Sequence, residues 1–314
     1  MLVLRHLERI ARRPLPPVVT LGNFDGVHRG HQEILRRTVA AARAADCEAV
    51  AITFWPHPSQ VLTPARGTAL ITSLRQRIEQ IAACGIDVIV AQRFSRRFAT
   101  VTAEDFVKRL IHQRLGAQRV VVGHRVSFGH NRGGNAEVLR HLAGEVGLKV
   151  EVVEPVKVED HLVSSSAVRA ALRSGDLDHV RRLLGRAHSI AGRVIHGHHR
   201  GRTIGFPTAN LRLRGDRGGM LPPDGVYAVR LGWRNQWYPA IANIGFNPTF
   251  GDEQRSLETH VFDFDGDLYR QRVEVAFVER LRGEVKFGDA PALAAQIQRD
   301  VAAARAALAH ESKP

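Results

Sequence analysis

The chain of 314 residues has few cysteines and no long apolar run. Cys47 and Cys84 are its only cysteines, and neither belongs to a Cys-x-x-Cys pair or a Cys/His metal spacing. Two thiols cannot form a disulfide framework, so we expect a reducing, cytoplasmic location. No apolar run approaches the roughly 18–20 residues that a membrane-spanning helix requires. Charges interrupt the apolar positions of the first 14 residues, so we expect neither a membrane partner nor a signal peptide.

Aromatic residues are also scarce beside the positive charge. Lys and Arg total 45 against 31 Asp and Glu, a formal net charge of +14, with only three Tyr and three Trp. Such a balance suits nucleic acid or small anionic substrates such as nucleotides. Binding of single strands requires aromatic stacking platforms, however, and many arginines lie on predicted helix faces. We therefore expect a solvated basic surface. Nucleic-acid binding stays an alternative that predicts salt-sensitive retention and no turnover.

The length and the change of pattern along the chain predict two domains, 1–186 and 187–314. Residues 18–185 alternate apolar runs with amphipathic helices, which predicts an α/β, doubly wound parallel sheet. Ligands bind such sheets at the carboxyl ends of the strands. The predicted strands are 18–21, 49–54, 87–91, 119–122 and 148–153. The predicted helices are 30–45, 73–84, 103–115, 135–145, 164–173 and 176–184.

After about residue 187, short strands separated by turn-rich pieces predict a small barrel or sandwich. The predicted strands are 190–196, 225–231, 237–244, 258–262 and 271–278. One amphipathic helix, 290–309, closes the chain, and the segment 183–188 is the expected joint between the domains.

The segment GNFDGVHRGHQ, residues 22–32, follows the first predicted strand and leads into a helix. His28 and His31 are three residues apart, so at a helix start they share a face. Glycines permit close approach of the backbone to a ligand, and a helix N-terminus attracts phosphate. Two imidazoles can donate to charge that develops on a transferring phosphoryl group. The spacing and its position favour a phosphate site over a glycine turn with two surface histidines.

A second segment, VSSSAVR, residues 163–169, follows the last predicted strand of the same sheet. Its serines can cap a helix and donate to phosphate oxygens, with Arg169 one turn along the same face. Such a segment alone is often only a helix cap. Its place after the sheet allows it to reach the same crevice.

The segment RGRTIGFPTANL, residues 200–211, lies in the second domain. Thr208 and Asn210 occupy alternate positions of an incipient strand, so both side chains lie on one face. A hydroxyl and an amide oxygen suit Mg²⁺ shared with phosphates, although a tight turn before a strand explains the pattern equally well. The Walker sequence GxxxxGK[ST] is missing.

Acidic residues concentrate in residues 247–269. Asp263, Asp265 and Asp267 imitate the rhythm of a calcium loop, but the later EF-hand glutamate and the flanking helices are missing, so we expect a hairpin turn. Glu258 differs, because it begins an apolar strand and points inward or into a cleft. A carboxylate there costs stability unless it has a role, and activation of a hydroxyl is one such role.

These motifs together resemble a known enzyme family over nearly the whole chain. LGNFDGVHRGHQ, TFWPHP (53–58) and VSSSAVR are similar to the FMN adenylyltransferase half of the bacterial bifunctional riboflavin kinase/FMN adenylyltransferases. PTAN, LPPDGVYAV, YPAIANIG and FVERLRGEVKF resemble the riboflavin kinase half. The resemblance implies a nucleotidyltransferase domain followed by a six-stranded β-barrel with a C-terminal helix. It implies phosphorylation of riboflavin to FMN by ATP, then adenylylation of FMN to FAD with release of pyrophosphate.

The resemblance also implies the site residues of the adenylyltransferase. His28 and His31 would stabilise the charge at the α-phosphate, while Ser164, Ser165 and Arg169 would hold the leaving phosphates. His57 would lie beside the nucleotide, although between two prolines it also suits a plain turn. The residues expected to bind this ATP are Gly22, Phe24, Asp25, His28, His31, His57, Ser164, Ser165 and Arg169.

In the kinase half, the resemblance makes Glu258 the base that takes the proton from the terminal ribityl hydroxyl as it attacks the γ-phosphorus. Thr208 and Asn210 would hold Mg²⁺ and the ATP phosphates. The residues expected to bind this ATP are Gly201, Arg202, Gly205, Pro207, Thr208 and Asn210.

One segment departs from the family pattern. Relatives read GxDFxFG or GxNFxFG where this chain has GHRVSFGHNRGG, residues 123–134. Arg125 and Val126 replace the acid or amide and the aromatic residue, while Phe128 stays in register. The expected flavin-side residues are Arg125, Phe128 and Asn131, and we expect weakened binding of FMN. Alternatively, Arg125 turns outward and Asn131 supplies the polar group, or the chain is a riboflavin kinase whose N-terminal domain is weak or altered.

Overall fold

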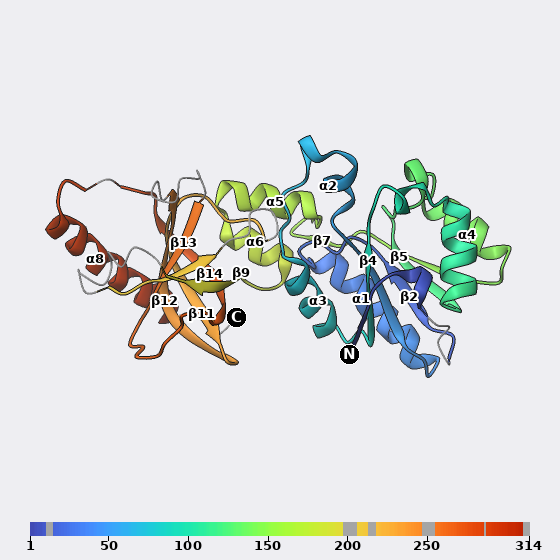
Figure 1. Cartoon of the computed structure of the whole chain (residues 1–314), viewed down its shortest axis with the longest axis horizontal. Helices are drawn as coiled ribbons and strands as arrows, with labels where there is room; N and C mark the ends of the chain where they lie inside the picture. The colour runs from blue at the N-terminus through green and yellow to red at the C-terminus, as the bar shows by residue number, and fades with distance from the viewer. Residues whose placement is uncertain (11–14, 197–205, 213–217, 247–254, 286, 310–314) are drawn as a thin grey trace. The chain divides into compact units, whose positions relative to one another are not determined.

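The computed structural model of the chain describes residues 1–10, 15–196, 206–212, 218–246, 255–285 and 287–309. They form two compact units (Figure 1). The first comprises Met1–Ala69 and Leu74–Ser164, and the second comprises Leu70–Ser73 and Ser165–Pro314. The predicted domain boundary at residue 186 stays a prediction.

The first unit contains a sheet of six parallel strands in the order β1-β4-β3-β2-β5-β6. From β2 the chain adds β3 and β4 on one side, then returns to add β5 and β6 on the other. The order in which strands are added to the sheet therefore reverses between the parallel neighbours β2 and β5. This is the topological switch point, where such sheets bind ligands. The strands are β1 (Leu2–Leu4), β2 (Val18–Leu21), β3 (Ala49–Trp55), β4 (Val88–Arg93), β5 (Arg119–Gly123) and β6 (Lys149–Val153).

Helices cover both faces of this sheet, because alternate strand residues point to opposite cores. Val18, Ala49 and Ala51 pack with helices α1 and α3, whereas Val19 and Val50 pack with η4 and α4. This confirms the predicted doubly wound α/β architecture. The helices are α1 (Arg29–Ala44), α2 (Pro58–Leu62), α3 (Leu74–Ala83), the π-helix η4 (Asp105–Arg114) and α4 (Ala136–Gly144). Short 3₁₀ turns are η1 (Leu7–Arg9), η2 (Pro64–Arg66), η3 (Phe98–Thr100) and η5 (His130–Arg132), and β7 (Lys157–Val158) pairs with β8 (His161–Leu162).

The second unit is built around a closed, antiparallel six-stranded barrel, in the order β10-β13-β12-β11-β14-β9. Tyr227, Val229 and Leu231 alternate along β11 and face the barrel core. The strands are β9 (His188–Ile195), β10 (Ala209–Arg212), β11 (Gly225–Trp233), β12 (Gln236–Phe246), β13 (Arg255–Val261) and β14 (Arg272–Arg282). The helices are α5 (Ser165–Ser174), α6 (Leu177–Leu184) and α8 (Ala290–Ala309).

Helix α8 closes one side of the barrel. Ala304 and Leu308 pack on Val226, Ala228 and Ile241. The bounds 290–309 are those predicted from the sequence, and the six strands with a final helix confirm the predicted barrel.

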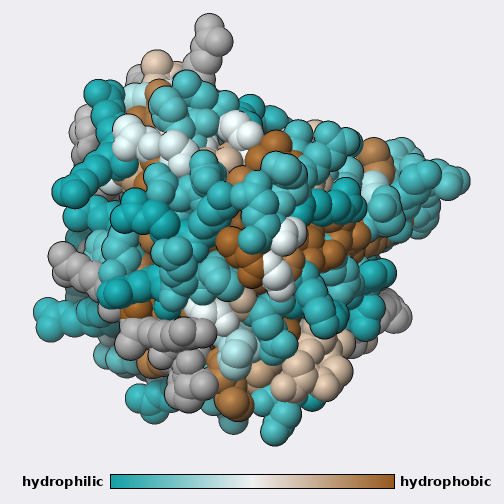
Figure 2. Space-filling view, turned by 90° about the vertical axis from the view of Figure 1, so that its right-hand side faces the viewer, coloured by the Kyte–Doolittle hydropathy of each residue, from teal (hydrophilic) through white to brown (hydrophobic). Residues whose placement is uncertain are grey.

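The surface in Figure 2 is largely hydrophilic, with hydrophobic residues in separate smaller patches. Among the residues that the structure describes, no helix is both long enough and apolar enough to span a bilayer.

Candidate active sites

The loop that follows β2 lies at the switch point of the parallel sheet. Gly22 donates its N–H to the carbonyl of Ile52 (3.0 Å), which continues the pairing with β3 beyond the end of β2. Thr53 then donates its hydroxyl to the carbonyl of Asn23 (3.0 Å). These bonds hold the first half of GNFDGVHRGHQ against β3, at the carboxyl end of the sheet.

The same loop contains unusual backbone conformations. Phe24 and Val27 have φ of 47° and 40°, in the left-handed region. A β-branched residue is a genuine outlier there. Both side chains are only 1% exposed, so packing holds the loop in this conformation.

The two histidines meet at the N-terminus of α1. His28 is the N-cap, and its Nδ1 accepts the N–H of His31 (3.3 Å). The neutral ring then carries its proton on Nε2. The two rings stack with centroids 3.6 Å apart, and Phe24 contacts His31 edge-on. A Cβ on Gly30 would lie 3.2 Å from the His28 ring, so glycine leaves room for the imidazole.

Asp25 lies in this loop, but its side chain is buried. Its carboxylate is 3.6 Å from the guanidinium of Arg77, and both side chains are at most 1% exposed. A contact of Asp25 with ATP stays a prediction.

The serine segment spans the boundary between the units. The carbonyl of Val163 lies 3.7 Å from an ideal Cβ on Gly30, so the chain before Ser164 passes close to the start of α1. Ser165 and Arg169 belong to α5 of the second unit. Their predicted role at the leaving phosphates stays a prediction.

His57 has a local structural role. It is the N-cap of α2, and its Nδ1 accepts the N–H of Ser59 (3.3 Å). The Gln60 side chain completes a capping box by accepting the N–H of His57 (3.3 Å). A second role beside the nucleotide stays a prediction.

The loop after β5 carries the predicted flavin-side residues. Arg125 and Asn131 are exposed, whereas Phe128 is buried against Phe106. A Cβ on Gly134 would lie 2.6 Å from the Phe128 ring, so this glycine allows the ring to pack flat on the backbone. Their contacts with flavin stay a prediction.

Sequence reasoning missed an aromatic cluster beside this loop. Phe54 at the end of β3 contacts Phe94 and Phe98, and Phe98 contacts Phe106. Phe54 lies near the end of β3 and Phe94 follows β4 directly, and these two aromatic residues at neighbouring strand ends were the signal that the sequence offered.

In the barrel, β10 and β13 bring the predicted kinase residues together. Asn210 lies directly opposite Glu258 in the antiparallel register. Asn210 Nδ2 donates to Thr208 Oγ1 (3.3 Å), and Thr208 Oγ1 donates to Glu258 Oε2 (3.4 Å). An amide, a hydroxyl and a carboxylate therefore form one hydrogen-bonded chain. Gly201, Arg202 and Gly205 lie outside the described residues.

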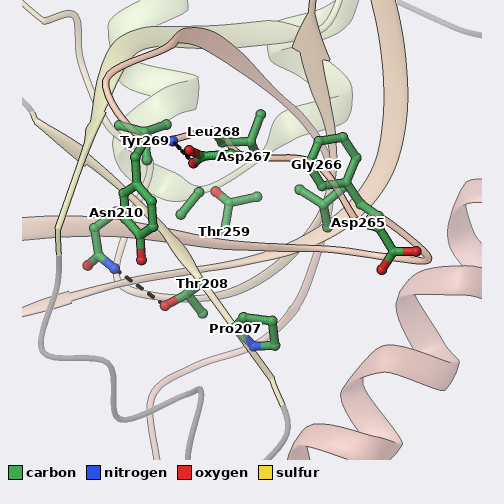
Figure 3. Close-up of a pocket in the computed structure, with 13 residues that line it drawn as sticks. Pro207, Thr208, Asn210, Thr259, Asp265, Gly266, Asp267, Leu268 and Tyr269 are labelled. Carbon is green, nitrogen blue, oxygen red and sulfur yellow. Dashed lines mark hydrogen bonds between the residues drawn. The ribbon is translucent and has the colours of Figure 1, made fainter.

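A pocket of about 270 Å³ opens beside this chain of polar groups (Figure 3). Pro207, Thr208 and Asn210 line one part of it, and the loop from Phe264 to Tyr269 lines another. Asp267 accepts the N–H of Tyr269 (2.8 Å) within that loop. The loop connects β13 to β14, as the predicted hairpin turn does, but its contribution to a pocket was missed.

Comparison with known proteins covers both units. The FAD synthetase family model matches residues 11–167, and the riboflavin kinase family model matches residues 184–308. A solved chain from Streptococcus pneumoniae, described as a macrolide-efflux protein, superposes with a TM-score of 0.87 at 33% identity and covers 97% of this chain and 99% of its own. That description applies to that protein, and the likeness supports the fold.

Similar curated proteins carry one shared description, bifunctional riboflavin kinase/FMN adenylyltransferase. The relative from Pseudomonas fluorescens is 39% identical over 98% of both chains. The Escherichia coli K12 relative is 36% identical over 97% of both, and the Bacillus subtilis relative is 37% identical over 90% of both. The matches over both halves do not favour a kinase alone. The chain therefore belongs to the family of bifunctional riboflavin kinase/FMN adenylyltransferases.

Proposed function

We propose that the family's two activities have separate sites, with FMN adenylylation centred on the histidine pair beside the parallel sheet and riboflavin phosphorylation at the barrel. The observation that carries the first assignment is the stacked pair His28–His31 at the start of α1, at the switch point of the sheet. The observation that carries the second is the hydrogen-bonded chain Asn210–Thr208–Glu258 beside a pocket.

In the first site, an oxygen of the FMN phosphate attacks the α-phosphorus of ATP. A phosphorus–oxygen bond forms, the bond to the β-phosphate breaks, and pyrophosphate leaves. The Nε2–H of His28 and the ring of His31 stabilise the negative charge that develops on the α-phosphate oxygens. The positive end of the α1 helix dipole adds to this stabilisation. Ser164, Ser165 and Arg169 hold the departing phosphates.

Several first-site residues have supporting rather than reactive roles. Gly22 and Phe24 shape the loop, and the backbone of Asp25 passes the nucleotide. His57 approaches the nucleotide from the start of α2. On the flavin side, Phe128 contributes apolar surface and Arg125 or Asn131 contributes polar groups.

In the kinase site, Glu258 takes the proton of the terminal ribityl hydroxyl while that oxygen attacks the γ-phosphorus of ATP. The new phosphate ester is FMN, and ADP leaves. Catalysis of this kind depends on positioning and on neutralising charge. The hydrogen bond from Thr208 holds Glu258 in place before substrate binds.

The donor set of this site suits Mg²⁺. Thr208, Asn210 and Glu258 contribute hydroxyl, amide and carboxylate oxygens, without a thiolate or imidazole, and hard cations prefer such oxygens. Thr208 and Asn210 would hold the ion together with the ATP phosphates. Bound there, Mg²⁺ neutralises phosphate charge.

The proposed substrates and products are riboflavin, FMN, FAD and ATP, and the proposed location is the cytoplasm. Two free cysteines and the absence of a disulfide framework suit a reducing compartment. We propose no nucleic-acid or membrane partner.

One assay tests these assignments. The purified chain is incubated with riboflavin, ATP and Mg²⁺, and riboflavin, FMN and FAD are separated by chromatography over time. We expect FMN to form first and FAD to follow. FMN without FAD would support the kinase-only alternative. Absence of both products, with salt-sensitive retention on nucleic acid, would support the nucleic-acid-binding alternative.

A further inference from the structure

Arg77, on α3, is among the largest fully buried side chains of the described residues, with 0% exposure. Its Nη2 lies 3.6 Å from Oδ1 of Asp25 in the loop after β2. Its Nη1 donates to the carbonyl of Phe54 near the end of β3 (3.3 Å). One guanidinium therefore joins two segments that both carry predicted site residues.

Stability alone does not explain this ion pair. Removing two charges from water is costly, and apolar residues of similar volume often replace a buried pair without loss of stability. Phe24 and Ile78, which are adjacent to the pair in sequence, pack in an apolar core with Leu35 and Ile81, and apolar side chains in place of the pair would suit such surroundings.

The backbone on both sides of Asp25 indicates another role. Asp25 lies between Phe24 and Val27, whose left-handed conformations L-residues rarely adopt. Such conformations persist where the surrounding structure holds them, and they concentrate at functional sites. Asp25 is the charged residue of the turn 24–27, and the buried guanidinium of Arg77 is its partner in the ion pair.

We propose that Arg77 is a positioning residue for adenylyl transfer, which holds the turn 24–27 through Asp25 so that His28 enters α1 with its ring stacked on His31. The bond to Phe54 fixes the end of β3 at the same time, three residues before His57. Arg77 is buried and acts through Asp25, so it does not touch ATP. This inference rests on the proposed adenylyltransferase function of the first unit.

The test compares Arg77→Met, which keeps much of the volume without the charge, with Asp25→Asn, which is nearly isosteric. For each variant, kcat and KM for ATP are measured in FAD formation from FMN. Displacement of a catalytic group by about 1 Å can cost about 100-fold in rate. We expect kcat to fall about 10-fold or more, KM to change less than about threefold, and Arg77→Lys to restore most of kcat.

The same molecule supplies controls. FMN formation from riboflavin should be unchanged in every variant, because that site lies in the barrel. Ile81→Ala, on the same helix and also 0% exposed, lowers stability but keeps both members of the Arg77–Asp25 ion pair. Assayed below its unfolding temperature, it should keep the wild-type kcat. Wild-type kcat in both Arg77→Met and Asp25→Asn, or an equal loss in Ile81→Ala, would overturn the inference.

A measurement that does not depend on FAD formation tests this inference separately from the proposed function. If the wild-type chain makes no FAD, the proposed function fails. The ¹⁵N signals of the His28 and His31 imidazoles still test the positioning role. We expect Asp25→Asn to shift both signals and Ile81→Ala to leave them in place. Unchanged signals in Asp25→Asn would overturn the role of the pair.

Discussion

Glu258 is the residue on which the proposed kinase chemistry depends. It lies opposite Asn210 and accepts the hydroxyl of Thr208, so Gln can replace it with little change of shape. The amide cannot take a proton. We therefore expect Glu258→Gln to slow FMN formation by roughly two to four powers of ten, the usual contribution of a general base. The measurement is the initial rate of FMN formation from riboflavin and ATP.

The control for this variant is in the other unit. Conversion of supplied FMN to FAD should continue at the wild-type rate, and the barrel unit should unfold at the wild-type urea concentration, which shows that both units are folded. Near-normal phosphorylation of riboflavin would reject Glu258 as the base.

Arg125 carries the second prediction at this scale. The flavin N3–H is a donor, and arginine only donates, so Arg125 cannot accept from it as an amide can. We expect Arg125→Asn to improve FMN binding by about 1 kcal/mol or more, the size of one hydrogen bond. Isothermal titration with FMN measures this change.

Arg132→Asn is the matched control, because Arg132 is also exposed on the loop after β5 and the variant makes the same change of charge. Equal gains of FMN affinity in both variants would show that the gain comes from removing a positive charge and not from the position of Arg125. Weaker FMN binding or less FAD in Arg125→Asn would make Arg125 a working ligand.

At the scale of elements, periodicity predicted the regular structure because most helices and strands bury one face. Helix α8 begins and ends where the pattern places it. The edge strand β1 was missed because three half-exposed residues are too few to show an alternating pattern. Helix α2 was missed because Pro56 and Pro58 precede Ser59 and prolines indicate a turn. The apolar period of η4 does not distinguish the π-helix from an α-helix.

In the candidate sites, too, contacts between sequence neighbours could be predicted and contacts between distant residues could not. Local spacing predicted the His28–His31 pair and the Thr208–Asn210 pair, since both depend on neighbours in sequence. Arg77 could not be predicted, because an arginine in an amphipathic helix suggests a solvated face until the fold brings Asp25 to it. Non-local contacts of this kind have no signal in one sequence.

Helix α8 is attached to the barrel by ion pairs of different burial. Asp300 accepts from Nε and Nη2 of Arg282 (3.0 and 2.7 Å), and its side chain is 7% exposed. Asp300→Asn leaves the guanidinium without its charge partner. We expect a loss of about 3 kcal/mol in the unfolding free energy of the barrel unit, as for a broken buried pair. Urea unfolding followed by the fluorescence of the barrel tryptophans measures it.

Asp263→Asn is the matched control, because Asp263 pairs with Arg305 of the same helix but is 76% exposed. Water already solvates such a pair, so we expect a much smaller loss. Equal losses in the two variants would contradict the role of burial.

Helix α1 provides a prediction about pH. Hydrogen bonds from Arg36 and then Arg37 lower the pKa of Glu33 from 4.5 to about 2. Because the folded pKa is depressed, the stabilisation is present above about pH 4.5 and is lost as the pH falls toward 2. We expect Glu33→Gln to melt slightly below wild type at neutral pH, with a difference that shrinks through this range. A difference independent of pH would contradict the assignment.

At the scale of the molecule, one chain joins two phosphate chemistries, and FMN, the product of one, is the substrate of the other. The sheet contributes a helix N-terminus and imidazoles, which suit attack at an α-phosphate. The barrel contributes a carboxylate beside a hydroxyl and an amide, which suit activation of an alcohol. The two sets of side chains lie in different compact units.

This division predicts that each activity can be removed separately. His28→Ala removes the imidazole that caps α1, so we expect FAD formation from FMN to stop while FMN formation from riboflavin continues. Thr208→Ala removes the donor to Glu258, and Asn210→Ala removes the donor to Thr208, so we expect either variant to lose FMN formation and keep FAD formation. The measurement is chromatography of the products when riboflavin or FMN is supplied to each variant.

Mixing the variants completes the test. His28→Ala supplied with riboflavin should release FMN, and Thr208→Ala added afterwards should convert that FMN to FAD, because neither variant alone carries out both steps. Thermal unfolding of each variant serves as the control for folding. Loss of both activities in a folded His28→Ala variant would indicate one shared site. Failure of the mixture to make FAD, with each variant active alone, would show that the FMN formed by His28→Ala stays bound to that variant.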